Sequence, residues 1–116
     1  MRSVEAADWT LEIPETNVER TRGLLGRDAL DPTHAFVLAR CRSVHTIGMR
    51  FAIDVVSFDK DWTMVDVRTL PPGRIRWPRG GVRHVIETAG GRGQAFSASL
   101  DGRTIREALG NDRRRT

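Results

Sequence analysis

The chain has 116 residues, a mass of 13.0 kDa and a formal charge of +4, from 19 basic and 15 acidic residues. This length supports one domain, and 39% apolar with 29% charged residues excludes a disordered or collagen-like chain. No apolar run reaches the roughly 20 residues of a membrane-spanning helix, so we expect no membrane partner. The single cysteine, Cys41, excludes an internal disulfide and favours a reducing compartment, so we expect a cytoplasmic protein.

The first part of the chain predicts two strands and one helix. Apolar residues alternate with polar ones over 9–13, which predicts a strand with one buried face. Thr16 and Glu19 have the spacing of a capping box, which predicts a helix over 17–25. A short apolar run over 35–39 predicts the next strand.

The middle of the chain predicts a hairpin. Residues 40–50 show neither the helical nor the strand period. The nearly continuous apolar run over 51–58 indicates a central strand covered on both faces. A turn over 59–61 and an alternating strand over 63–70 complete an antiparallel hairpin. After a long loop, residues 82–88 predict one further strand.

The C-terminal part predicts less regular structure. Residues 94–99 fit a short helix, whereas residues 104–109 fit either a helix or an edge strand. We expect a single domain over 1–110, followed by a basic disordered tail over 111–116. Together these elements predict a mostly β (α+β) fold, a compact barrel-like or sandwich-like domain with one packed N-terminal helix.

Three segments occur in an order typical of one known family: ERTRGLLGR at 19–27, HTIGMRFAIDVVSFD at 45–59 and VIETAGG at 85–91. They resemble the motifs of the family called domain of unknown function 192. The resemblance covers about residues 10–103. It implies a compact β-rich domain with a helix near the N-terminus, and it implies no activity and no catalytic residues.

An arginine-rich segment is the first candidate site. From Val67 to Ile86 the chain has five arginines and no acidic residue. Guanidinium groups beside an aromatic ring can bind an anionic small molecule, an acidic protein partner or, less favoured here, nucleic acid. The alternative is a solvated loop without a ligand. The candidate ligand-binding residues are Arg68, Arg74, Arg76, Trp77, Arg79 and Arg83.

Asp54 is the second candidate, because it interrupts an apolar strand. A buried carboxylate must be paired or protonated. Together with His45 and His84 it would form the acid–base pocket of a small enzyme, provided that the three side chains converge in a cleft. The favoured alternative is a fixed charge that anchors the preceding loop through hydrogen bonds.

Cys41, His45 and Met49 recur every four residues, and on a helix they would present soft ligands for Cu(I) on one face. The segment does not have a helical pattern, so this metal site is the least favoured and no cofactor is expected. We therefore expect an uncharacterised binding or accessory module, with a small enzyme or a soft-metal site as alternatives.

Overall fold

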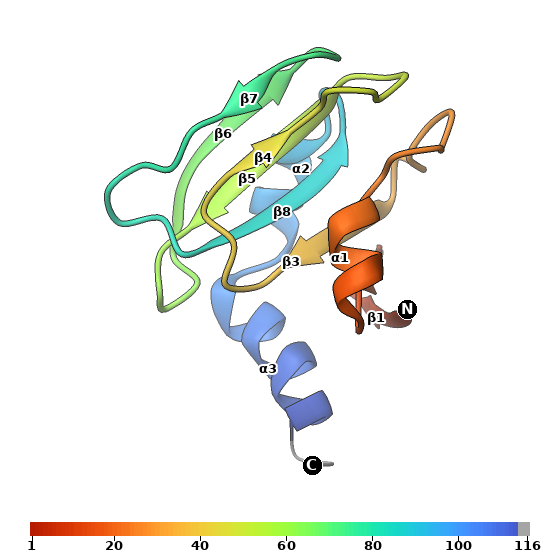
Figure 1. Cartoon of the computed structure of the whole chain (residues 1–116). Coiled ribbons are helices and arrows are strands. Elements are labelled where there is room, and N and C mark those ends of the chain that lie inside the picture. Colours follow the sequence, from red (N-terminus) through yellow and green to blue (C-terminus); the bar gives the residue numbers. More distant parts are fainter. Residues whose placement is uncertain (114–116) are drawn as a thin grey trace.

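The structure, a computed structural model, describes the backbone of residues 1–113 and the side chains of residues 1–110. Its centre is an open six-stranded sheet of order β1-β2-β3-β8-β5-β6 (Figure 1). The β2–β3 pair is parallel and the other four pairs are antiparallel. The sheet ends at β1 and β6 without closing, so the expected barrel is not found. The strands are β1 (Arg2–Ala6), β2 (Trp9–Ile13), β3 (His34–Leu38), β5 (Ile53–Phe58), β6 (Met64–Leu70) and β8 (His84–Ala89).

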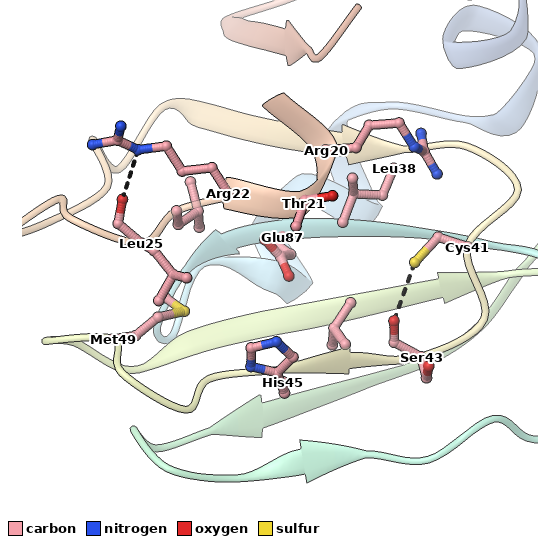
Figure 2. A pocket seen from close by; sticks show the side chains of 13 residues that line it. Arg20, Thr21, Arg22, Leu25, Leu38, Cys41, Ser43, His45, Met49 and Glu87 are labelled. Atoms are coloured by element: carbon pink, nitrogen blue, oxygen red, sulfur yellow. Dashed lines mark hydrogen bonds between the residues drawn. The ribbon is translucent and has the colours of Figure 1, made fainter. Parts of the chain in front are cut away.

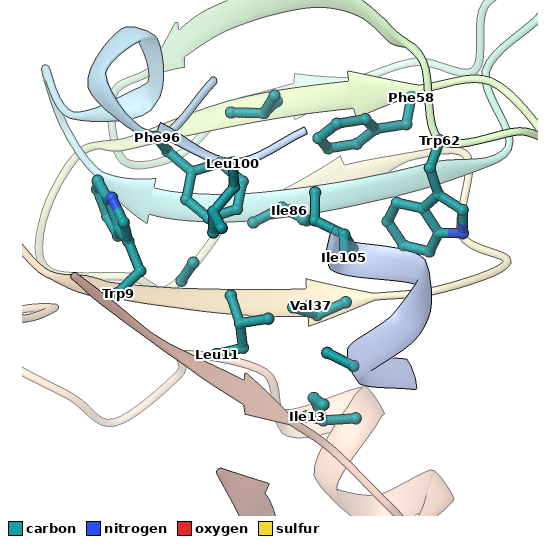
Figure 3. Packing of buried hydrophobic residues seen from close by; sticks show 13 residues of the cluster. Trp9, Leu11, Ile13, Val37, Phe58, Trp62, Ile86, Phe96, Leu100 and Ile105 are labelled. Atoms are coloured by element: carbon teal, nitrogen blue, oxygen red, sulfur yellow. The ribbon is translucent and has the colours of Figure 1, made fainter. Parts of the chain in front are cut away.

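Two C-terminal helices, α2 (Gly93–Ser99) and α3 (Gly102–Arg113), cover one face of this sheet (Figure 1). They bury a cluster of apolar side chains against the strands (Figure 3). The rings of Trp9 and Phe96 meet edge to face within it, with centroids 5.0 Å apart. The members that Figure 3 labels are Trp9, Leu11, Ile13, Val37, Phe58, Trp62, Ile86, Phe96, Leu100 and Ile105.

The opposite face is covered by irregular segments and a small second sheet, in which β4 (Val44–His45) pairs with β7 (Ile75–Arg76). A second apolar cluster lies beneath them. Strand β5 contributes to both clusters, with Ile53 and Val55 on this face and Val56 and Phe58 on the helical face. All six residues of β5 are buried, which confirms the predicted central strand and its hairpin with β6.

Helix α1 (Asn17–Arg22) is shorter than predicted and buries none of its residues. Its capping box is confirmed, because the Thr16 hydroxyl accepts from the Glu19 N–H while the Glu19 carboxylate accepts from the Thr16 N–H. The helix ends at Gly23, whose φ of 54° leaves the right-handed helical region. A packed N-terminal helix is therefore not confirmed, and the helices that pack on the sheet are α2 and α3.

The ends of the chain differ from the expectation. Strand β1 was not predicted, because it alternates only half-buried and exposed residues and so has a weak apolar pattern. Residues 104–109 belong to α3, near whose start Asp101 accepts a hydrogen bond from the Thr104 N–H. Helix α3 continues to Arg113, and residues 114–116 of the expected tail lie outside the described part. No helix in the described part is long and apolar enough to cross a membrane.

Candidate functional site

The arginine-rich segment begins in β6, contains β7 and ends in β8. Arg76 and Arg79 each place a guanidinium nitrogen 2.6 Å from the same oxygen of Asp66, so the chain itself balances part of this charge. The side chain of Trp77 is 70% exposed and does not fold back on the domain. The arginines of this segment without an ion pair in the described structure are Arg68, Arg74 and Arg83.

Asp54 is 3% exposed and both of its carboxylate oxygens accept hydrogen bonds. One accepts from the Thr69 hydroxyl at 2.7 Å, and the other accepts from the backbone N–H of Gly93 at 2.8 Å. The Asp54 carboxyl group thus holds the start of α2 against the sheet, rather than the loop before β5.

The three candidate acid–base residues do not converge. His84 pairs in register with Phe58, four residues along β5 from Asp54, a separation of about 13 Å. Its Nδ1 accepts a 2.8 Å hydrogen bond from the Arg40 N–H, and its ring stacks on Trp62 at 4.1 Å. Burial lowers the pKa of His84, which favours a neutral, structural imidazole. His45 is exposed and lines a cavity over the opposite face of the sheet.

That cavity, which we call the Glu87 cavity, has a volume of about 220 Å³ and lies between α1, β4 and the main sheet (Figure 2). Glu87 projects into it from β8 and is 5% exposed. Burial raises the pKa of Glu87 to about 7. The lining residues labelled in Figure 2 are Arg20, Thr21, Arg22, Leu25, Leu38, Cys41, Ser43, His45, Met49 and Glu87.

Cys41, His45 and Met49 all line the Glu87 cavity, but they approach it from different sides (Figure 2). The Cys41 thiol donates to the Ser43 carbonyl at 3.1 Å, and burial raises the pKa of this thiol. The raised pKa favours the protonated sulfur, whereas a metal ligand must be a thiolate. No group of three His, Cys, Asp or Glu side chains in the described structure is placed to hold a metal.

A second hollow, which we call the cationic recess, has a volume of about 620 Å³ and lies where α3 passes the ends of β2 and β3. Its apolar wall includes Trp62 and Leu109. Its acidic residue, Glu15, lies 3.5 Å from the amino group of Met1. Four cationic side chains line it: Arg20, Arg40, Lys60 and Arg106.

Sequence reasoning missed the cationic recess and Glu87. The four cations of the recess are far apart in the chain, so no local motif connects them. Glu87 carries a signal like that of Asp54, an acid among apolar residues of a predicted strand, but the sequence analysis did not select it as a candidate.

Comparison with known proteins places the chain in a family. The model of the DUF192 family, described as "Uncharacterized ACR", matches residues 2–103. The chain belongs to the DUF192 family. This confirms the resemblance seen in the three sequence motifs.

Two archaeal UPF0127 proteins support the assignment to DUF192. One from Thermococcus sibiricus is 33% identical over 86 residues, which cover 69% of this chain and 56% of that protein. One from Pyrococcus abyssi is 32% identical over 83 residues, which cover 66% of this chain and 68% of that protein. The aligned part is thus little more than half of the Thermococcus relative. These names describe uncharacterised proteins and assign no activity.

Two solved structures share the DUF192 fold seen here. A proposed transcription regulator from Sinorhizobium meliloti superposes with a TM-score of 0.65 at 19% identity, over 81% of this chain and 78% of that chain. A protein of unknown function from Novosphingobium aromaticivorans gives a TM-score of 0.62 at 17% identity, over 81% of this chain and 75% of that chain. At these identities the similarity shows the fold alone.

Proposed function

We propose that this DUF192 domain is a binding module for a small multivalent anion, which occupies the cationic recess. The observation that carries the proposal is the charge imbalance of that recess. Among the described residues, four cationic side chains from separate segments and one carboxylate line it. A hollow lined by one sign of charge concentrates ligands of the opposite sign.

The cations of the recess are available to a ligand. Arg40, Lys60 and Arg106 make no ion pair within the described residues. Arg20 donates one guanidinium N–H to the Ala39 carbonyl at 2.9 Å and has further donors. Guanidinium groups bind phosphate or carboxylate oxygens through paired hydrogen bonds. The ligand class is therefore a compact polyphosphate or polycarboxylate.

The walls of the recess support binding of a ligand with an apolar part. The stacked rings of Trp62 and His84 form one wall, with ring planes only 3° apart. Arg40 and Trp62 both adopt positive φ, 54° and 64°, which is unfavourable for residues other than glycine. Such backbone strain is concentrated at functional sites. The volume lies within the range of about 300–1,000 Å³ that is typical of ligand pockets.

The arginine-rich segment is a second candidate surface for an anion. Arg68, Arg74 and Arg83 have no carboxylate partner in the described structure, and Trp77 is exposed for stacking. This surface is outside the recess and suits an extended polyanion or an acidic protein partner. The enzyme alternative has less support, because His84 is held by the Arg40 N–H and lies away from Asp54 and His45.

Titration calorimetry with inorganic tripolyphosphate tests the proposal. Arg106→Ser removes one charge from the recess, and Arg103→Ser removes one charge from the same helix at a side chain that is 84% exposed and does not line the recess. We expect Arg106→Ser to weaken binding about tenfold, the effect of losing one charge-assisted contact of roughly 1.4 kcal/mol. We expect Arg103→Ser to change it less than twofold.

The triple variant R68S/R74S/R83S separates the two surfaces. Unchanged tripolyphosphate affinity in this variant supports the recess. A loss of affinity in the triple variant, with none in Arg106→Ser, would assign the anion to the arginine-rich segment. Absence of binding to the wild-type domain at millimolar tripolyphosphate would refute both forms of the proposal.

A further inference from the structure

Glu87 is a largely buried acid that has no hydrogen-bond or ion-pair partner among the described residues. Its side chain is 5% exposed, yet it accepts no hydrogen bond from the described residues. Buried polar groups are nearly always paired, so an exception requires an explanation. The comparison with Asp54 shows that this fold can satisfy a buried carboxylate, because two donors reach Asp54 from β6 and α2.

The carboxyl group of Glu87 faces the open volume of the Glu87 cavity, not the packed interior (Figure 2). Leu38, Val44 and Met49 give the cavity apolar walls. Burial is the cause of the raised pKa of Glu87. Among the described residues, no cation or hydrogen-bond donor reaches its carboxyl group.

The mouth of the cavity has the opposite character. Arg20 and Arg22 of α1 line it, and Arg22 is exposed. Each donates one N–H to a backbone carbonyl, at 2.9 Å to Ala39 and 3.3 Å to Leu25, and keeps further donors. The cavity thus combines an acid without a partner among the described residues, apolar walls and, on its α1 side, two cations whose guanidinium groups lie on opposite sides (Figure 2).

We propose that the Glu87 cavity binds a small aliphatic amine that carries an anionic group at its other end. The ammonium group donates to Glu87, the methylene chain packs on Leu38, Val44 and Met49, and the anionic group lies at Arg22. Desolvating both charges requires that both be paired, which explains why one ligand would carry both. This ligand differs in class from the anion of the cationic recess, and although Arg20 lines both hollows, Glu87 and Arg22 do not line the recess.

Three probes of equal carbon number test the proposal by calorimetry: 6-aminohexanoate, hexylamine and hexanoate. We expect 6-aminohexanoate to bind at least tenfold tighter than hexanoate, with hexylamine between them. Because Glu87 is about half protonated at pH 7, binding of the ammonium group should release roughly half a proton, measured in buffers of different ionisation enthalpy. The other titratable side chains lining the cavity are Arg20, Arg22, Cys41 and His45.

Two variants locate the contacts. Glu87→Gln should remove both the preference for 6-aminohexanoate over hexanoate and the proton release. His45→Gln should leave the preference and the proton release unchanged. Arg22→Ser should bring the affinity for 6-aminohexanoate close to that for hexylamine. Arg106→Ser, in the cationic recess, should leave all three affinities unchanged, so this test and that of the anion site fail independently.

Three outcomes would overturn the proposal. One is tighter binding of hexanoate with proton uptake, which would make protonated Glu87 a donor to an anion. Another is 6-aminohexanoate binding that is unaffected by Glu87→Gln. The third is no binding of any probe to the wild-type protein at 10 mM, roughly the weak limit of a specific site. The ranking of the three probe affinities on the wild-type protein still tests the proposal if a variant fails to fold.

Discussion

Asp54 of β5 accepts a 2.8 Å hydrogen bond from the backbone N–H of Gly93, the first residue of α2. The first N–H groups of a helix have no partner inside the helix. No side chain of the preceding segment caps α2. A strand residue 39 positions away in the chain therefore supplies this acceptor and fixes the helix to the sheet.

Asp54→Ala should destabilise the domain. The change leaves the Gly93 N–H and the Thr69 hydroxyl without their acceptor and opens a small void, a loss of about 2–4 kcal/mol. Asp54→Asn keeps one acceptor oxygen and should cost less, about 1–2 kcal/mol. Urea unfolding of both variants measures the difference. An alanine variant as stable as the wild type would show that the hydrogen bonds contribute nothing.

Gly93→Ala should also destabilise, for a steric reason. A β carbon at residue 93 would lie 2.6 Å from Cγ1 of Val67 and 2.9 Å from Cβ of Asp54. Overpacking of this kind costs about 1–3 kcal/mol. Gly110→Ala is the matched control, because nothing lies within 4 Å of a β carbon there and the residue is helical. The free energy of unfolding of this control variant should increase by about 0.5–1 kcal/mol. Thermal unfolding measures both effects. If the melting temperatures of the two variants shift in the same direction, the steric clash at residue 93 is not the cause.

Glu87→Gln should change how stability depends on pH. Burial raises the pKa of Glu87 from 4.5 to about 7 in the folded protein. The folded state then holds this proton more tightly, so its contribution is fully present below pH 4.5 and is lost as pH rises through 7. The stability of the variant relative to the wild type should rise by about 2–3 kcal/mol between pH 5 and pH 8. A constant difference over this range would show that the carboxyl group titrates normally.

Glu12→Gln should have the opposite pH dependence. Burial alone would raise the pKa of Glu12, but hydrogen bonds from Arg27 and His34, each at 2.8 Å, outweigh it and lower the pKa below 4.5. The ionised carboxylate therefore stabilises the fold above pH 4.5, and this contribution is lost as pH falls through the folded-state pKa. The variant should lose about 1–3 kcal/mol at pH 7, and much less at pH 3. Equal losses at both pH values would contradict this role.

Asp66→Ser tests the arginine-rich segment as an anion surface. Arg76 and Arg79 share one oxygen of Asp66, so the change frees both guanidinium groups. If this segment binds polyanions, affinity for a single-stranded oligonucleotide should rise about two- to tenfold at 50 mM salt, and the gain should fall at 500 mM. Fluorescence anisotropy measures the affinity at both salt concentrations. Unchanged affinity would indicate that the segment is only a solvated loop.

Much of the fold could be predicted because its signals are local. The capping box of Thr16 and Glu19 acts within one turn, and the alternation over 9–13 predicts strand β2, although Glu12 on its other face is buried as well. Strands β4 and β7 could not be predicted, because a strand of two residues is too short to show a period. Their pairing also depends on the second apolar cluster that they cover. The open sheet was also missed, since strand patterns predict strands and not whether a sheet closes.

The sequence by itself determined the family, the mostly β class and the unusual position of Asp54, because motif order, residue alternation and an acid in an apolar run are all readable along the chain. Only the tertiary structure decided which charges are satisfied. Asp54 finds donors on β6 and α2, whereas Glu87 finds none in the described structure and faces a cavity. The physical reason is that pairing and burial depend on neighbours that are distant in sequence, and the same separation hides the four cations of the recess until the chain folds.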